Sequence, residues 1–422
     1  MKRVRVKGFE LAAGFVLLAS IAVGAAGGGS LGHAAAGAGQ EQTAGAGIAA
    51  SGVFADLGGH WAASSVSDAV YQGYVDGYPD GTFKPELSVT RAEFVKMAMT
   101  ALKLPLGPAG GVWYDTYVRG AVSAGMYKYD FASGTWDDPI TREEMAMLAV
   151  RAAVKDVRDA VAYDKKKYMY AATKAGLIQG MDDRGTLGMD QPTTRAQSVM
   201  IIERILTVNS GGELSGDKYA VSTAELAWHK TNIFTVMPEF FDFAKVDEGH
   251  EWNPDNLFVE TPDGQFRGEL DAMVAIDLTD PQDPNRKLLP KLDQMQWYKW
   301  TSRTQGYPIT NYPDSYIVIY QSHVDYNKNK DVYADIDHIY AGMAGLGAPE
   351  SLDEAFMAGE LNRATDIFLN RIGDTMAIIV PKKIASQVEQ IDISVYAPAR
   401  PPADIARKEL LIVTPQRILS TK

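Results

Sequence analysis

Three copies of one short pattern occupy the first half of the chain. Each copy has a Thr-Arg-x-Glu/Gln element followed by an apolar helical face. The arginines of successive copies lie 51 residues (142 minus 91) and then 53 residues (195 minus 142) apart. A fixed period with small insertions marks a tandem array of structural units. Upstream of each element, an apolar i, i+3 pair is followed by a glycine suited to end a helix. Each copy therefore predicts a helix, a turn-rich loop and a second helix. Because such short helices cannot bury their apolar faces alone, we expect the three units to pack together. The three elements are Thr90-Arg91-Ala92-Glu93, Thr141-Arg142-Glu143-Glu144 and Thr194-Arg195-Ala196-Gln197.

The first copy carries further motifs in a fixed order: Phe54-x-Asp56, Gly59-His60-Trp61-Ala62, and the loop Gly77-Tyr-Pro-Asp-Gly-Thr-Phe83. This order, closed by Thr-Arg-Ala-Glu, resembles the S-layer homology (SLH) domain of Gram-positive surface proteins, a domain normally present in three copies. The resemblance extends over residues 52–208. It implies a helical triplet packed as a pseudo-threefold unit. The second and third copies are degenerate: the second keeps Trp113, whereas the third has Asp164 at the place of Trp61.

The Thr-Arg-x-Glu element has a structural explanation of its own. Threonine at the N-cap with Glu or Gln at the third helical position forms a capping box, which satisfies orphaned amides at a helix start. This explains the pairs Thr90 with Glu93, Thr141 with Glu144, and Thr194 with Gln197. It leaves the arginines unexplained, because a cation at the first helical position faces the positive end of the helix dipole. Either a buried carboxylate or an anionic ligand must compensate, and both alternatives stay open at this point.

The SLH resemblance favours the ligand. It implies that the repeated arginine lies in grooves between the copies and helps to hold the secondary cell wall polymer, an anionic glycan that bears ketal-linked pyruvate. A guanidinium fork suits such a carboxylate. The groove that uses Arg91 is expected to bind most strongly, because the first copy is the most intact. The other candidate contacts are Asp56, which is alternatively a turn former, and two tryptophans that are either sugar-stacking faces or core. The polymer-binding set is Arg91, Arg142, Arg195, Asp56, Trp61, Trp113, Glu93, Glu144 and Gln197.

The chain begins with features of an exported protein. Four basic residues precede an apolar stretch, and Ala34-Ala35-Ala36 offers a small-residue cleavage site, as in a secretory signal peptide. Removing it changes the formal net charge from -12 to -15, since four basic residues and one acidic residue leave. So acidic a chain argues against nucleic acid as a partner, and no later apolar stretch is long enough to span a membrane. The predicted divisions are 1–36 signal peptide, 37–51 flexible lead, 52–103, 104–155 and 156–208 repeats, 209–216 linker, and 217–422 C-terminal domain.

The C-terminal half matches no family pattern. Four apolar or alternating runs predict strands, at 316–320, 377–380, 391–395 and 410–413, and a helix is predicted over 352–372. These elements indicate a mixed, β-rich α+β domain. Nothing in the segment has the spacing of a Walker loop, a zinc protease or a thiol nucleophile. Four acids, Glu239, Asp242, Glu248 and Glu251, are the candidates for a carboxylate pair of a glycan hydrolase.

Alternate oxygen-bearing residues begin at Asp325. They are Asp325, Asn327, Asn329 and Asp331, which match positions 1, 3, 5 and 7 of a calcium loop. Position 6 is Lys330 instead of Gly and position 12 is Ile336 instead of Glu, so we expect weak calcium binding or an ordinary polar loop, and no other cofactor. The favoured function is a non-enzymatic surface protein held on the wall by the triplet. Its C-terminal domain is then structural, self-assembling, or bound to other surface proteins. The alternative is a wall-anchored enzyme acting on polysaccharide or peptidoglycan.

Overall fold

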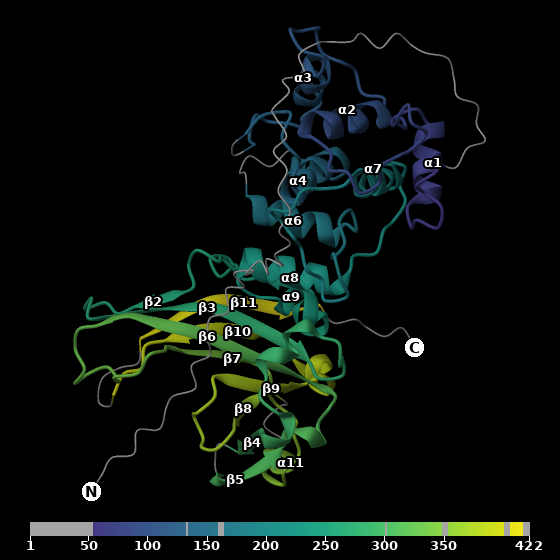
Figure 1. Cartoon of the computed structure of the whole chain (residues 1–422). Coiled ribbons are helices and arrows are strands. Elements are labelled where there is room, and N and C mark those ends of the chain that lie inside the picture. The colour runs from purple at the N-terminus through teal and green to yellow at the C-terminus, as the bar shows by residue number, and fades with distance from the viewer. Residues whose placement is uncertain are drawn as a thin grey trace, which may run out of the picture. The chain divides into compact units, whose positions relative to one another are not determined.

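The computed structural model describes residues 54–131, 134–158, 164–299, 302–347, 353–400 and 406–416 (Figure 1). The predicted signal peptide and flexible lead lie outside these residues. Helices dominate up to His229 (the helical half) and strands dominate after it (the sheet half). This agrees with the prediction of helical repeats followed by a β-rich domain. The helices of the first half are α1 (Ala63–Tyr71), α2 (Arg91–Ala101), α3 (Asp115–Ser123), α4 (Arg142–Ala153), α5 (Lys155–Arg158), α6 (Lys165–Lys174), α7 (Arg195–Asn209) and α8 (Lys218–His229).

Each predicted helix pair is present, and local chemistry explains its ends. The helices α2, α4 and α7 all start at a complete capping box, with the threonine side chain and the third helical residue bonded as predicted. The first helix of each pair ends before a glycine of positive φ: Gly73 at 76°, Gly125 at 72° and Gly176 at 69°. Glycine adopts this left-handed conformation without steric cost. One hydrophobic core contains residues from all three pairs.

Backbone hydrogen bonds join the three helix pairs into a closed ring. The N–H of Val89 donates to the carbonyl of Thr193 (2.9 Å), Thr193 to Ile140 (3.0 Å), and Ile140 back to Val89 (2.9 Å). At the helix starts the donation runs in the opposite direction around the ring: Arg91 N–H donates to the Asp138 carbonyl, Arg142 to Gln191, and Arg195 to Leu87. The second helix of each pair therefore begins against the loop of another pair. Its first amides are satisfied by that neighbour, as orphaned helix-start amides require.

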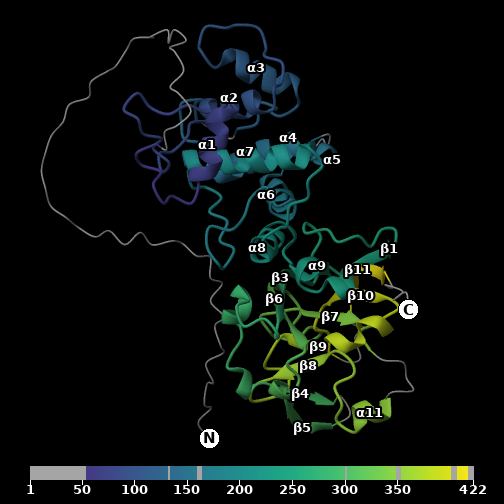
Figure 2. The ribbon, with the colours of Figure 1, turned by 90° about the vertical axis from the view of Figure 1, so that its right-hand side faces the viewer.

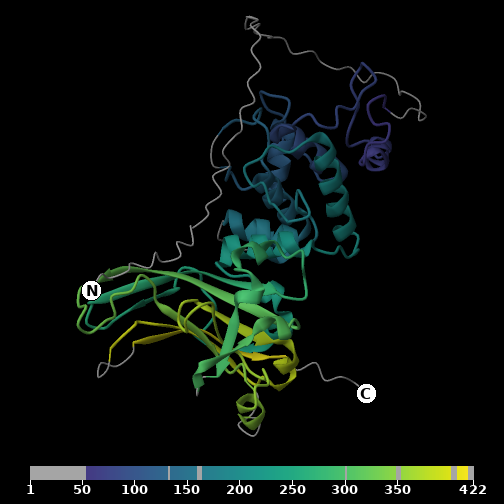
Figure 3. The ribbon, with the colours of Figure 1, turned by 60° about the horizontal axis from the view of Figure 1, so that its bottom comes forward.

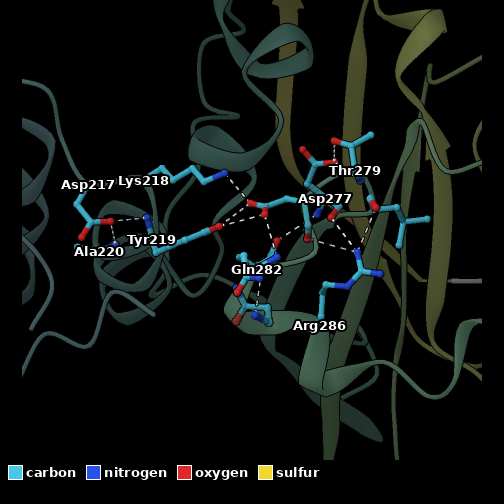
Figure 4. Close-up of polar contacts among 12 residues, drawn as sticks. Asp217, Lys218, Tyr219, Ala220, Asp277, Thr279, Gln282 and Arg286 are labelled. Atoms are coloured by element: carbon cyan, nitrogen blue, oxygen red, sulfur yellow. Dashed lines mark hydrogen bonds and ion pairs between the residues drawn. The ribbon is translucent and has the colours of Figure 1, made fainter. Parts of the chain in front are cut away.

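Helix α8 follows the predicted linker and contacts both the helical half and the sheet half. Its Ala220 and Ala224 belong to the hydrophobic core of the helical half, and it packs beside α6 and α9 (Ile233–Val236), as Figure 2 shows. At its start, Lys218 Nζ and the Tyr219 hydroxyl both donate to Asp280 of the sheet half (Figure 4). Asp280 lies in the turn that follows strand β3 (Phe266–Asp277), and Arg286 holds that turn by donating to its carbonyls. The domain boundary at 217 stays a prediction.

The second half contains two antiparallel sheets (Figures 1 and 3). One has the strand order β2-β3-β6-β9-β8-β4-β5 and the other β1-β11-β10-β7. Short helices α9, α10 (Pro238–Phe241) and α11 (Asp353–Met357) accompany them. The strands are β1 (Phe243–Val246), β2 (Phe258–Glu260), β3 (Phe266–Asp277), β4 (Gln296–Lys299), β5 (Ser302–Pro308), β6 (Ser315–Asn327), β7 (Tyr340–Ala344), β8 (Thr365–Phe368), β9 (Ala377–Pro381), β10 (Ile391–Tyr396) and β11 (Arg407–Pro415).

Strand β6 explains how the sheets are buried. Its Tyr316, Val318 and Tyr320 enter a core shared by the two sheets. Ile317 and Ile319 point the other way, into a second core that covers the opposite face of the larger sheet. Burial on both faces removes the polar alternation of a half-exposed strand, so the run at 316–320 is apolar throughout. The four predicted strands are confirmed within β6, β9, β10 and β11.

The predicted helix over 352–372 is wrong. Helix α11 ends at Met357, and Gly359, with φ of 101°, turns the chain out of the helical conformation. The residues that follow include β8, which pairs with β4 and β9. Its apolar spacing fits a strand equally well, since Ile367 alone faces the core while its neighbours are more exposed. Sheet pairing therefore overrides the helical periodicity of this segment.

Candidate functional site

Arg91 is satisfied inside the protein. Its Nε and Nη2 donate to the two carboxylate oxygens of Glu144, at 2.9 and 2.6 Å, and its Nη1 donates to the Thr135 carbonyl at 3.0 Å. Only 7% of Arg91 is exposed. The hydrogen bonds that Arg91 donates to Glu144 raise the pKa of Arg91 against the opposing effect of burial. Of the two explanations open for the arginines, the buried carboxylate partner holds at this position. Arg91 thus faces the second copy and not the intact loop of its own, and the expectation that its groove binds most strongly stays a prediction.

Arg142 has no such partner. Its Nε donates to the Leu187 carbonyl at 2.7 Å and its Nη2 to the Gln179 carbonyl at 2.8 Å. It is 5% exposed, and no carboxylate of the described residues lies within ion-pair distance of it. Burial, followed by the positive charge of Arg204, lowers the pKa of Arg142.

Arg195 faces the intact loop of the first copy. Its Nε donates to the Phe83 carbonyl (2.9 Å) and its Nη2 to the Asp76 carbonyl (2.7 Å). The guanidinium also lies over the rings of Phe83 and Tyr78, at 4.5 and 5.0 Å from their centroids. Unlike the other two arginines it is half-buried. The described part of the chain supplies no carboxylate within ion-pair distance of it.

The three acidic or amide members of the motif act as helix caps. Side-chain oxygens of Glu93, Glu144 and Gln197 accept the amide of the preceding threonine, at 2.8, 3.2 and 3.1 Å. Glu144 alone of the three also holds an arginine. The capping explanation is therefore confirmed, and a direct contact of these side chains with polymer stays a prediction.

Both candidate tryptophans are exposed. Trp61 is 62% and Trp113 is 53% exposed, so neither is a core residue. Trp61 lies against His60 with ring centroids 5.3 Å apart, and Trp113 meets Tyr114 edge to face at 5.4 Å. The adjacent Leu57 and Ala62 fill the core in place of Trp61. Two flat apolar surfaces at equivalent places thus remain open to solvent.

Asp56 organises the loop that meets Arg195. Its two carboxylate oxygens accept the backbone amides of Phe83 (2.9 Å) and Lys84 (2.7 Å). Desolvation would raise the pKa of Asp56, but these hydrogen bonds outweigh it and the pKa is lowered. The same Phe83 offers its carbonyl to Arg195. Asp56 is therefore a turn former that also fixes an acceptor of the arginine.

One functional candidate was not found from the sequence. Arg204 of α7 donates to the Gln179 side chain at 3.1 Å and to the Leu177 carbonyl at 3.3 Å. It lies 53 residues after Arg151 of α4, which instead pairs with Asp130 and the Tyr168 hydroxyl. The shared register of Arg151 and Arg204 was the available signal.

The calcium candidates are partly in a strand. Asp325 and Asn327 belong to β6, so only Asn329 and Asp331 lie in the loop. Asp325 accepts from Arg267 Nε at 2.9 Å and contacts His323 at 3.1 Å. Asn327 and Asn329 accept backbone amides. Within the described residues no three His, Cys, Asp or Glu side chains converge as a metal site. Weak calcium binding here stays a prediction.

The four acids considered for hydrolysis do not form a described pair. Glu239 accepts the Tyr316 hydroxyl at 2.7 Å, while Asp242, Glu248 and Glu251 are exposed. A groove of about 460 Å³ lies elsewhere, at the C-terminal ends of α2, α4 and α7, and Asp and Glu are missing from its lining. None of the described helices is long and apolar enough to cross a membrane.

Comparison with known proteins places the first copy in a family. The S-layer homology domain model matches residues 53–95. The S-layer protein of Bacillus licheniformis is 28% identical over 179 residues, which is 40% of this chain and 18% of that protein. A cellulosome-anchoring protein of Acetivibrio thermocellus is 45% identical over 56 residues, 13% of this chain and 12% of that protein. An amylopullulanase of Thermoanaerobacterium thermosulfurigenes is 31% identical over 107 residues, 24% of this chain and 6% of that protein.

The chain thus spans less than a fifth of the length of each of these relatives. Their names include both a surface-layer protein and an enzyme, so the relationship concerns the shared domain and not one activity. The matched residues 53–95 contain Asp56, Trp61 and Arg91 in the order that the motif requires. On this match, residues 53–95 of the chain are an S-layer homology domain.

Proposed function

We propose that all three helix pairs are SLH domains and that together they hold the exported protein on the bacterial cell wall without a covalent bond. The ligand is the anionic secondary wall polymer, and the sheet half has a structural, assembly or binding role at the surface. The family match and the relatives named as S-layer and anchoring proteins support this proposal.

One observation carries the proposal most directly. The helical half keeps two tryptophans in solvent and two arginines without a described carboxylate partner, all on the repeated motif. Exposed aromatic rings suit the apolar faces of sugars, and guanidinium groups suit carboxylates. Because the chain is acidic overall, such local positive positions are what an acidic polymer needs for binding.

The test uses residues 37–422 and purified wall sacculi. The protein should co-sediment with sacculi that retain their polymer and stay in solution when the polymer has been stripped. Equal sedimentation with both preparations, or with neither, would remove the polymer from the proposal. The double variant Trp61→Ala with Trp113→Ala should lose most of the binding, because both changed rings are exposed and belong to the motif. Tyr340→Ala is the matched control, since Tyr340 is 46% exposed but lies in the sheet half.

A further inference from the structure

Each of the two sheets has two edge strands, and three of these four edges are protected against pairing with another chain. Strand β1 carries Lys245 and pairs irregularly with β11, β2 is three residues long and ends in Glu260, and β5 ends at Pro308. Short length, charge, irregular pairing and proline are the devices by which native sheets blunt their edges. Among the strands that the structure describes, the fourth edge, β7, has neither a charged residue, a proline nor an irregularity.

Strand β7 offers an open row of backbone groups. It pairs with β10 through five consecutive residues, and no described strand lies on its other side (Figure 1). All five residues are at least partly exposed. Ala341 and Met343 pack against the core between the sheets, so Tyr340, Gly342 and Ala344 lie on the opposite face of the strand. Alternate N–H and C=O groups of β7 therefore point away from β10, where no described strand pairs with them.

The sequence of β7 is complementary to itself. In an antiparallel pair centred on Gly342, Tyr340 of one molecule lies opposite Ala344 of the other, and Ala341 lies opposite Met343. Each larger side chain then meets a small one on both faces of the sheet, as favourable cross-strand packing requires. The two glycines meet at the centre, where no side chain separates the strands. Such a pair uses the same surface twice, as two-fold dimers do.

The distribution of charge favours the same edge. The chain has a formal net charge of -12, so most contacts between two molecules would bring like charges together. Residues 339–347 contain no charged side chain. On the neighbouring strand β10, Asp392 is neutralised by a hydrogen bond from Arg407. Strand β7 is therefore a place where two acidic molecules can meet without repulsion.

We propose that two molecules of this protein associate through β7, antiparallel about a two-fold axis at Gly342, so that their smaller sheets join into one continuous sheet. This association is additional to wall binding and does not depend on it. Because the shared edge is only five residues long, the interface is small and the dimer is weak. Because the other three edges are protected, the assembly closes at two molecules and does not extend into a fibre.

Introduced cysteines test the register, since the chain has no cysteine of its own. Gly342→Cys places two thiols opposite each other at the axis, and the nearest atom to an added Cβ is a Tyr396 ring carbon at 3.7 Å. Mild oxidation of this variant of residues 37–422 should give a disulfide-linked dimer. Ala344→Cys is the matched control, because its two thiols lie four residues apart along the strands, about 13 Å, beyond the reach of a disulfide. Equal cross-linking of both variants, or none of Gly342→Cys, would overturn the two-fold pairing.

Sedimentation equilibrium of residues 37–422 measures the association without a covalent link. The unaltered protein should change from monomer to dimer as its concentration rises through the micromolar range. Gly342→Lys brings two ammonium groups together at the axis, so the dissociation constant should rise about tenfold or more at a nearly unchanged melting temperature. Gln282→Lys adds the same charge at an exposed turn of the sheet half and should not weaken the dimer. Equal dimerisation of Gly342→Lys and the unaltered protein would reject β7 as the interface.

The remaining outcomes also decide against the proposal. A protein that stays monomeric up to about 10⁻³ M would overturn it. If the β7 amides of such a monomer exchange slowly with solvent, another segment of the same molecule covers the edge; if they exchange fast, the edge is open and unused. Oligomers larger than a dimer would overturn the closed two-fold arrangement. None of these results bears on wall binding, which sedimentation with sacculi tests separately.

Discussion

The helical and sheet halves treat their charged and aromatic side chains differently. In the sheet half, Arg267 pairs with Glu260 and Asp325, Lys382 with Asp277, and Arg407 with Asp392. The helical half leaves Arg142 and Arg195 on carbonyls alone and keeps Trp61 and Trp113 in solvent. These three cations of the sheet half have carboxylate partners and need no ligand charge, although Arg286 there also rests on backbone carbonyls. We therefore expect a ligand to bind at the repeated arginines and exposed tryptophans of the helical half.

The largest expected effect tests whether the charge of Arg91 is neutralised by an ion pair within the protein. Glu144→Gln removes the carboxylate that holds Arg91 through two hydrogen bonds and leaves only the half-exposed Asp138 at 3.6 Å, so the free energy of unfolding should fall by about 3 kcal/mol. Glu93→Gln is the matched control: it changes the equivalent cap, which holds no described arginine, and should change the free energy by less than about 1 kcal/mol. Chemical denaturation measures both. Equal losses would mean that the ion pair adds nothing beyond the cap.

Helix α8, which contacts both halves, contains a buried acid that should make stability depend on pH. Glu225 of α8 is fully buried, and burial raises its pKa from 4.5 to about 7 despite hydrogen bonds from Thr235 and Phe234. The folded state therefore holds this proton where the unfolded chain has released it. The free energy of unfolding should fall by about 3 kcal/mol as pH rises from 4.5 to about 7, and no further above that. The variant Glu225→Gln should lack this dependence, and an unchanged slope would assign it to other groups.

A smaller effect separates binding from stability among the arginines. Arg195→Lys keeps the charge but loses the fork, so polymer affinity should fall about tenfold, or about 1.4 kcal/mol, at a nearly unchanged melting temperature. Arg91→Lys should do the reverse, lowering the melting temperature because it weakens the contact with Glu144. Paired titrations and thermal melts measure both quantities. If the two variants behave alike, the arginines are equivalent after all.

The smallest effect concerns calcium near Asp325. A dissociation constant of about 10⁻³ M would give about 1 kcal/mol of stabilisation at about 5 mM calcium, a rise of a few degrees at most. Asp325→Ala with Asp331→Ala should abolish the rise. Melting curves that coincide in calcium and in chelator would leave these side chains with their contacts to Arg267 and to backbone amides.

Local features were predictable from the sequence and partnerships across copies were not. The capping threonines and the helix-ending glycines act within one copy, so their roles were visible in the motif itself. The strand runs were visible because β6 and β9 are buried on both faces. Strand β3 was missed, since its Gly268 and Asp271 accompany two irregularities in its pairing with β6 that break a simple alternation. The different fates of Arg91 and Arg142 depend on residues about 50 positions away, which no single copy reveals.

The ring formed by Val89, Ile140 and Thr193 has a consequence for how this chain tolerates change. Because main-chain groups form its hydrogen bonds, the ring requires only a suitable backbone conformation at these three residues. Side chains of the second and third copies are then free to drift from the motif while the assembly persists. Closure also fixes the copy number: with the third copy bonded to the first, a fourth would find no open edge to extend, in contrast to an open solenoid that grows by stacking.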